Sequence, residues 1–158
     1  MNFDRKFSIF LEIAEVLNKY GIIPTLYGSL GVYRLIGQLD EIDDIDIVIP
    51  SIYAEEKLPE LLKIMQGIDY KQDKTFPHEF FKGEEQISFA LEEELKEFVG
   101  VDLSRYKTIK VGNAEFRELS PEDYLKFYKK ALKERDFKIK KMKIKIRALE
   151  KSLENNPK

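Results

Sequence analysis

The sequence predicts an α+β fold with a mixed β-sheet, and three observations carry this prediction. Near the N-terminus, helical and extended apolar patterns alternate. In the middle of the chain, two segments alternate apolar and polar residues around turn sequences, which is typical of hairpins. The final part of the chain carries an apolar pattern of helical spacing. The order helix, strand, helix, strand, helix, hairpins, helices indicates the α+β class.

The first 50 residues predict two helices and two strands. The first helix ends near Gly21, and a short apolar strand, IIPTLYG, ends at Gly28. A short helix follows Gly28 and Ser29 directly and closes at Gly37. A second strand, IDIVIP, is ended by Pro50. The apolar residues of the first helix recur at helical spacing: Phe7, Phe10, Leu11, Ala14 and Leu17.

The middle of the chain predicts one more helix and two hairpins. The first hairpin spans residues 70–90 around the turn KGEE, and the second, KTIKVGNAEFREL, turns at Gly112 and Asn113. The apolar face of the helix that precedes them consists of Leu58, Leu61, Leu62 and Met65. Together these segments complete a core that we place at residues 1–120.

Residues 121–158 are predicted to form a C-terminal helical extension. The signals for a helix start are strong here. Ser120 can cap a helix, Pro121 suits its first position and Asp123 supplies an acid three residues after the cap. The pattern leaves open whether this region is one helix or two, and whether its apolar seam is core packing or a homodimer interface. The seam consists of Leu125, Tyr128, Leu132, Ile139, Met142, Ile146, Leu149 and Leu153.

Composition limits the chemistry that the chain can perform. With 43% hydrophobic and 35% charged residues and no apolar run of the roughly 20 residues that a membrane span needs, we expect a globular cytoplasmic protein without a membrane partner. There is no cysteine and His78 is the single histidine, so thiolate and multi-histidine metal sites are excluded. Any metal would be held by oxygen, which indicates Mg²⁺, Mn²⁺ or Ca²⁺.

Asp44 and Asp46 are unusual in a strand that is otherwise Ile and Val. Alternation along the strand places both carboxylates on the face opposite Ile45, Ile47 and Ile49. Roughly 7 Å apart, at an effective dielectric constant of about 20, they repel by on the order of 2 kcal/mol. Water, a basic side chain or a bound cation could offset this repulsion, and a solvent-facing edge pair is the alternative to a metal site.

Gly28 and Ser29 lie where a strand passes into a helix. Glycine permits a tight turn and the close approach of a ligand, and the helix start offers unpaired N–H groups to an anion. Ser29 could cap the helix or donate to a phosphate oxygen, although an ordinary turn and cap would use the same residues. Arg34, on the same helix, either reaches a phosphate or lies on a solvated face.

The stretch YGSLGVYRLIGQLDEIDDIDIVIP resembles the nucleotidyltransferase superfamily with the polymerase-beta-like core. Its signature is a hydrophobic residue, Gly and Gly or Ser, a spacer, then Asp-hydrophobic-Asp. The likeness is greatest to the small antibiotic adenylyltransferases and to nucleotidyltransferases of toxin–antitoxin pairs. It covers residues 23–50 and extends more weakly through GVDLSRYKTIKVGNAEFRELSPEDYLKFYKKAL. The resemblance implies a nucleotidyltransferase-like core with flanking helices.

The resemblance also implies roles for individual residues. Asp44 and Asp46 would coordinate Mg²⁺ or Mn²⁺ ions that bridge the phosphates of a nucleoside triphosphate. Gly28, Ser29 and the amides that follow would hold the terminal phosphates, with Arg34 as a further candidate for nucleotide binding. A nucleotidyl group would then pass to a hydroxyl on a small molecule, a protein or RNA. Nucleotidyl transfer depends mostly on positioning and charge neutralisation, which these residue types provide.

The third carboxylate of the family is missing from its expected position. In the strand QISFALEE, Ser88 occupies the place where the family carries an acid that helps to hold the catalytic metal and acts as base. We assign this role to Glu92, just beyond the strand, with Glu85 and Asp102 as alternatives. With Ser88 in that place and no substitute, chemistry would be weakened while nucleotide binding could survive.

Two departures from the family keep other functions open. Aminoglycoside-type enzymes tend to carry a basic residue shortly before the Asp pair, whereas this chain carries Asp40, Glu41 and Asp43. The favoured hypothesis is an Mg²⁺-dependent nucleotidyltransferase. The alternative is a nucleotide-binding or protein-interaction module of the same fold that lost the third acid. A third hypothesis is an RNA-associated protein that uses the lysine-rich C-terminal helix.

Overall fold

The structure, a computed structural model, describes residues 2–134 and 138–155. Six α-helices and two short 3₁₀ helices lie within this part of the chain. The α-helices are α1 (Phe3–Lys19), α2 (Gly28–Ile36), α3 (Leu58–Gly67), α4 (Glu92–Val99), α5 (Pro121–Glu134) and α6 (Ile139–Asn155). The 3₁₀ helices are η1 (Ser51–Ala54) and η2 (Leu103–Arg105).

The described residues form one mixed sheet of seven strands, in the spatial order β3-β4-β5-β2-β1-β7-β6. The strands are β1 (Thr25–Tyr27), β2 (Ile45–Ile49), β3 (Lys71–Gln72), β4 (Glu79–Lys82), β5 (Glu85–Leu91), β6 (Ile109–Val111) and β7 (Ala114–Glu118). Strand β2 runs antiparallel to β1 and parallel to β5, while β1 runs parallel to β7. The predicted α+β class with a mixed sheet is therefore confirmed.

One face of the sheet is covered by α1 and α3. The alternate side chains Ile45, Ile47 and Ile49 of β2 enter a cluster with the apolar faces of these two helices, and all three are fully buried. Burial of each such side chain contributes about 1.5–3 kcal/mol. Because the period of a strand is two, packing these isoleucines sends Asp46 and Val48 to the other face.

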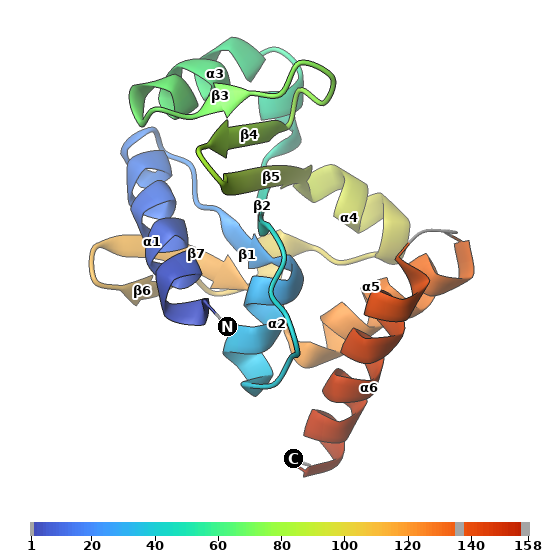
Figure 1. Ribbon diagram of the computed structural model, residues 1–158. Coiled ribbons are helices and arrows are strands. Elements are labelled where there is room, and N and C mark those ends of the chain that lie inside the picture. The colour runs from blue at the N-terminus through green and yellow to red at the C-terminus, as the bar shows by residue number, and fades with distance from the viewer. Residues whose placement is uncertain (1, 135–137, 156–158) are drawn as a thin grey trace.

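The other face of the sheet is covered by α4, α5 and α6. Val48 of β2 and Val32 of α2 share a second apolar cluster with Leu95 of α4, Tyr124 of α5 and Leu149 of α6. Figure 1 shows α1 on one side of the sheet and the α5–α6 pair on the other, with α2 below the central strands. Asp46 therefore points into the side of the molecule that the C-terminal helices cover.

Most elements form where the sequence predicts them, and two points are settled or corrected. The C-terminal region contains two helices, α5 and α6, which lie side by side (Figure 1). Strand β5 ends at Leu91, and Glu92 directly after it begins α4, a helix that the apolar pattern did not reveal. Its first turn carries three acids, which the positive end of a helix favours, and the Ser51 hydroxyl accepts the backbone N–H of Glu93 at 3.0 Å.

The C-terminal apolar seam packs within the chain. Tyr128, Met142 and Leu149 are buried in the second cluster, and Leu132, Ile146 and Leu153 are partly buried against it. Core packing, one of the two predicted uses of the seam, is therefore confirmed for these side chains. A homodimer through this seam stays a prediction.

No helix of the described part of the chain combines the length and the apolar composition that crossing a bilayer requires.

Candidate functional site

The centre of the site is the contact between Asp46 and Gly28. Gly28 opens α2 with a φ of +67°, and Asp46 projects from β2 beside it, because Tyr27 and Asp46 are paired residues of β1 and β2. A Cβ atom on Gly28 would overlap the Asp46 carboxylate and would lie 2.9 Å from its Cγ. Only glycine lets the carboxylate lie this close to the start of α2.

Ser29 fixes the segment that precedes β2. Its side chain is buried, with 1% exposed, and its hydroxyl accepts the backbone N–H of Asp43 at 2.8 Å. Lys6 of α1 donates to the Asp43 carbonyl at 2.7 Å. These bonds hold the acidic segment against α2, so the structure gives Ser29 a positioning contact. Its predicted contact with a phosphate stays a prediction.

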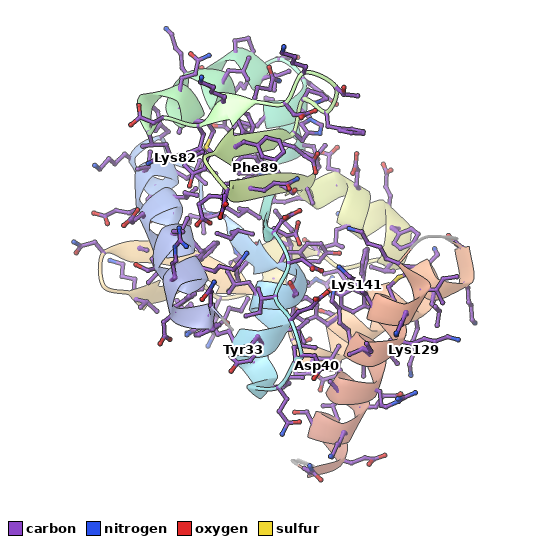
Figure 2. The ribbon with its side chains drawn as sticks, viewed as in Figure 1. Tyr33, Asp40, Lys82, Phe89, Lys129 and Lys141 are labelled. Atoms are coloured by element: carbon purple, nitrogen blue, oxygen red, sulfur yellow. The ribbon has the colours of Figure 1, made fainter. Side chains whose placement is uncertain are left out.

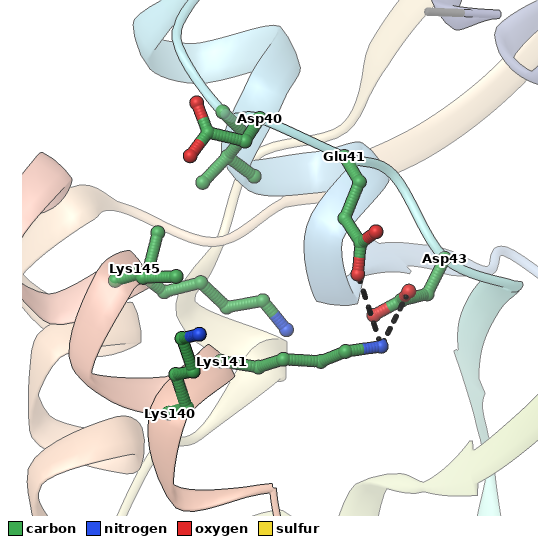
Figure 3. Close-up of a pocket in the computed structure, with 8 residues that line it drawn as sticks. Asp40, Glu41, Asp43, Lys140, Lys141 and Lys145 are labelled. Atoms are coloured by element: carbon green, nitrogen blue, oxygen red, sulfur yellow. Dashed lines mark hydrogen bonds and ion pairs between the residues drawn. The ribbon is translucent and has the colours of Figure 1, made fainter.

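Helix α6 presents a row of lysines to the acidic segment. The Lys141 ammonium lies 2.9 Å from Asp43 Oδ1 and 3.1 Å from Glu41 Oε1. Figure 3 shows Lys141 and Lys145 extending from α6 toward this segment, whereas Lys140 points away from it. Lys141 and Lys145 are four residues apart on one side of α6, and Lys138 directly precedes the helix.

Two adjoining cavities lie beside the basic side of α6. One, of about 190 Å³, has Gly28 and Asp46 on one wall and Lys138, Lys141 and Lys145 on the other. The second, of about 260 Å³, lies between α6 and the loop before β2 and shares Lys141 and Lys145 with the first. Figure 2 shows Lys141 between α6 and the central elements of the fold. The start of α2, a carboxylate and several cations therefore meet in one groove.

The charges of this groove perturb one another. Burial raises the pKa of Asp46 to about 7; the Lys145 charge opposes this shift and the Asp44 charge adds to it. Burial also raises the pKa of Asp44, with Lys138 opposing the shift. The pKa of Lys145 is lowered by burial, against the pull of Asp43 and Asp46. The carboxylates are thus held in surroundings that favour an additional positive charge.

The strand register places the expected third acid away from the Asp pair. Asp46 is paired with Ser88 of β5, and three residues further on Ile49 is paired with Leu91. Glu92 comes after Leu91, at the start of α4, roughly 13 Å along the strand from Ser88. Burial raises the pKa of Glu92, and the charge of Arg117 of β7 opposes this shift. The position of Glu92 therefore does not support the role that the sequence suggested for it.

The two alternative acids also lie elsewhere. Glu85 forms an ion pair of 2.6 Å with Arg5 of α1, on the opposite face of the sheet. Asp102 caps η2, accepting the backbone N–H of Ser104 at 3.0 Å, and these bonds lower its pKa. Among residues 2–134 and 138–155, no three acidic or histidine side chains stand close enough together to hold a metal ion.

Arg34 lies toward the end of α2 distant from Gly28. Its Nε donates to Glu118 of β7 at 2.8 Å, and its guanidinium lies 4.6 Å from the centre of the Phe7 ring. Both contacts tie α2 to α1 and β7. The structure thus gives Arg34 a structural ion pair, and its predicted contact with nucleotide stays without support.

The structure adds residues to the site that the sequence prediction missed. Lys141 and Lys145 were part of a lysine-rich run, and only their spacing on one helix side could have singled them out. Glu79 of β4 lies opposite Ser88, and its charge contributes to the raised pKa of Asp44. Counting outward from the turn of the KGEE hairpin would have revealed that pairing.

One curated relative has substantial sequence identity to the chain. It is the uncharacterized protein YnaI of Bacillus subtilis (strain 168), which is 41% identical over 124 residues, covering 78% of this chain and 80% of the relative. No family model matches the sequence.

Solved structures with the same fold are nucleotidyltransferase-like. An antigenic nucleotidyltransferase-like protein from Paracoccidioides brasiliensis superimposes with a TM-score of 0.65 at 18% identity, covering 92% of this chain and 75% of that one. The structure of ANT(2'')-Ia in complex with adenylyl-2''-tobramycin gives a TM-score of 0.58 at 16% identity, over 92% of this chain and 88% of that one. At these identities the likeness establishes the fold. The nucleotidyltransferase-like core that the sequence motif implied is confirmed.

Proposed function

Because the chain belongs to the family of B. subtilis YnaI and has the nucleotidyltransferase fold, we propose that it binds a nucleoside triphosphate with Mg²⁺ or Mn²⁺. We further propose that it transfers the nucleotidyl group to a hydroxyl. One observation carries the proposal: the Asp46 carboxylate lies against Gly28 at the start of α2 and faces the lysines of α6 across one cavity.

The donor set fits a hard divalent cation. Asp44 and Asp46 offer carboxylate oxygens, which Mg²⁺ and Mn²⁺ prefer, and Mg²⁺ is commonly held by one or two carboxylates together with phosphate oxygens and water. Burial raises the pKa of Asp46 to about 7, so a bound cation would relieve an unfavourable carboxylate charge. When bound, the metal would supply charge neutralisation at the phosphates.

The groove supplies separate partners for the phosphates. The first N–H groups of α2 lack partners within the helix and carry its positive end, and Gly28 permits close approach. Lys141 and Lys145 line the cavity on the other side. A triphosphate in this groove would compete with Asp43 and Glu41 for the Lys141 ammonium.

The proposed reaction is a direct displacement. The oxygen of the acceptor hydroxyl forms a bond to the α-phosphorus, and the bond from that phosphorus to the bridging oxygen of the β-phosphate breaks. Pyrophosphate leaves, and the hydroxyl proton passes to a carboxylate base. The chain positions the reactants and stabilises charge, which accounts for most of the acceleration in such reactions.

A second candidate function is a nucleotide-binding module without transfer activity. Ser88 beside Asp46 favours it, because the strand that should carry the third acid carries a hydroxyl instead. Such a module would bind the metal–triphosphate complex through the same groove and would release no pyrophosphate. An RNA-associated role gains less support, since Lys141 is engaged with Asp43 and Glu41 within the chain.

Thermal unfolding with each of ATP, GTP, CTP and UTP, with and without Mg²⁺, tests the binding proposal. We expect one or more triphosphates to raise the melting temperature of the natural chain only when Mg²⁺ is present. The Asp44→Asn/Asp46→Asn variant should lose this shift, while Asp69→Asn, at an exposed turn, should keep it. Absence of any metal-dependent shift at millimolar nucleotide would exclude both nucleotide functions.

Release of pyrophosphate then separates the transferase from the binding module. Labelled triphosphate is incubated with candidate acceptors from each class: hydroxylated small molecules, the chain itself or other proteins, and RNA. Transfer of label to one class identifies the acceptor. Binding without label transfer or pyrophosphate release in any class favours the inactive module.

A further inference from the structure

Three polar side chains form a row across three neighbouring strands. Asp46 of β2 is paired with Ser88 of β5, and Ser88 is paired with Glu79 of β4. Paired residues of neighbouring strands point to the same face of a sheet. Glu79 therefore shares the face of Asp46, on the side opposite α1, one strand beyond the position where the family carries its third acid.

Hydrogen bonds direct the Glu79 carboxylate toward β5. Its Oε1 accepts the Ser88 hydroxyl at 3.1 Å and the side-chain amide of Gln86 at 3.1 Å. Neighbouring strands are about 4.8 Å apart, and the bond to Ser88 shows that the longer glutamate side chain spans this distance. Within the described residues, Glu79 Oε2 accepts no hydrogen bond and forms no ion pair.

A second observation concerns the Asp46 carboxylate, which is on the same face of the sheet. This carboxylate lies beside Gly28 and lines the same cavity as Lys138, Lys141 and Lys145, yet within residues 2–134 and 138–155 its oxygens form no direct hydrogen bond or ion pair. Glu79 also lies near enough to Asp44 for the charges of the two carboxylates to interact. Asp46 and Glu79 Oε2 thus keep carboxylate oxygens without direct partners on one face of the sheet.

We propose that Glu79 is the third acid of this site. From β4 it supplies the carboxylate that the family carries on β5, at the position that Ser88 occupies in this chain. The inference rests on the proposed function. Glu79 would complete the oxygen ligands of the cation with Asp44 and Asp46, and would accept the proton of the acceptor hydroxyl as its oxygen bonds to the α-phosphorus. Ser88 and Gln86 are positioning residues that hold its Oε1.

Joint ligation by the three acids requires a movement of the Glu79 side chain. No three described acids are close enough to hold one ion as they stand, so Glu79 must turn about its side-chain bonds to bring an oxygen to the Asp pair. Such rotations move between staggered conformations and are fast for a partly exposed side chain. Glu79 is partly exposed, so its side chain borders solvent and has room to rotate.

Titration with Mn²⁺, followed by the loss of the free-ion electron paramagnetic resonance signal, tests this role without depending on turnover. The probe is Mn²⁺ added to the full chain together with the triphosphate that stabilises the natural chain most. We expect Glu79→Gln to weaken Mn²⁺ binding by about tenfold or more, because one carboxylate ligand is lost. Glu84→Gln, in the exposed turn of the same hairpin, should bind Mn²⁺ as the natural chain does.

Moving the acid back to β5 provides a stricter test. The double variant Glu79→Gln/Ser88→Asp carries the carboxylate at the position that the family uses, and should restore Mn²⁺ affinity to within about threefold of the natural chain. Circular dichroism of each variant establishes that it is folded. Restoration identifies the missing carboxylate, rather than general damage to the hairpin, as the cause of the loss.

The possible outcomes distinguish a failure of this inference from a failure of the proposed function on which it rests. If the natural chain binds Mn²⁺ and triphosphate while Glu79→Gln binds equally well, Glu79 is not a ligand and the inference fails alone. If Glu79→Gln weakens binding and Ser88→Asp does not restore it, the proposed replacement across strands is wrong. If the natural chain binds neither Mn²⁺ nor triphosphate, the proposed function fails and the inference with it.

Discussion

The contact between Gly28 and Asp46 links backbone geometry to the charge of the site. A side chain at position 28 would have to adopt a φ of +67° and would overlap the carboxylate. Gly37, at the other end of α2, has the same φ of +67°, but a Cβ atom added there would meet no atom within 4 Å. Substitution of Gly37 therefore measures backbone strain alone, whereas substitution of Gly28 measures the same strain together with the collision with Asp46.

Gly28→Ala should destabilise the chain by about 2–4 kcal/mol, because left-handed strain adds to overpacking. Gly37→Ala should cost about 1 kcal/mol, from the backbone alone. Free energies of unfolding from urea titration measure both effects, and triphosphate binding should be lost in Gly28→Ala only. Equal costs for the two substitutions would mean that the Asp46 carboxylate moves aside freely.

Asp46 makes the free energy of unfolding depend on pH, and the direction of this dependence follows from its pKa. Burial raises this pKa from 3.8 to about 7, so the folded state binds the proton more tightly than the unfolded state. The resulting stabilisation is complete below the unfolded pKa and is lost as pH rises through about 7. Without divalent cations, the free energy of unfolding should thus fall from about pH 5 to about pH 8.

Asp46→Asn should remove much of this fall and stabilise the metal-free chain at about pH 8 by roughly 1–3 kcal/mol. The same substitution should abolish stabilisation by Mg²⁺ and triphosphate. Urea unfolding at several pH values in the presence of EDTA measures the first effect, with Asp69→Asn as the exposed control. A natural chain and an Asp46→Asn variant with parallel pH profiles would contradict the assignment.

At the scale of elements, α6 has two roles. Its apolar side buries Met142 and Leu149 in the second cluster, and its basic side faces Gly28 and Asp46 across the cavity. Helical spacing makes this possible, because residues three or four apart share one side of the helix. Packing of the apolar side therefore sets the position of the lysines.

Lys145→Met should lower affinity for the triphosphate by about tenfold or more, since a charge-assisted phosphate contact is worth roughly 1.5–3 kcal/mol. Methionine retains most of the apolar stem, so α6 should stay in place. Isothermal titration calorimetry with the Mg²⁺–triphosphate complex measures the loss, and Lys151→Met, at an exposed position of α6, is the matched control. Equal affinities for the two variants would remove Lys145 from the site.

At the scale of the whole molecule, the C-terminal helices and the sheet share one apolar cluster. Leu149 of α6 is fully buried with Val48 of the central strand and Val32 of α2. The division at residue 120 that the sequence suggested stays a prediction. Shared packing of this kind favours unfolding of the sheet and the helices together.

Leu149→Ala should lower the free energy of unfolding by about 2–5 kcal/mol and leave a single transition. The sheet and the helical pair should lose structure together, so far-ultraviolet circular dichroism and tyrosine fluorescence should give coincident unfolding curves. An early transition confined to helical signal, with the sheet intact, would instead support a separate C-terminal unit.

Local patterns in the sequence were sufficient to predict most of the helices and strands. In the candidate site they singled out Gly28 and the Asp pair, and they missed Glu79 and the lysines of α6. Alternation identified β2 and both hairpins, Ser120 and Pro121 marked the start of α5, and Gly28 with the Asp pair indicated the fold. Helix α4 escaped notice because its acidic first turn follows a strand without a break. The assignment of Glu92 rested on closeness in sequence, whereas the register carries it to the far end of β5.

The sequence by itself determined the α+β class, the glycine at the start of α2 and the aspartates of the central strand, because these depend on backbone sterics and a side-chain period of two. Tertiary structure alone decided what faces them. Pairing of β2 with β5 brings Ser88 and its hairpin partner Glu79 beside Asp46, and packing of α6 brings Lys145 to Asp46, across separations of many residues in the chain. Such contacts are fixed by burial of the two apolar clusters, which no local pattern encodes.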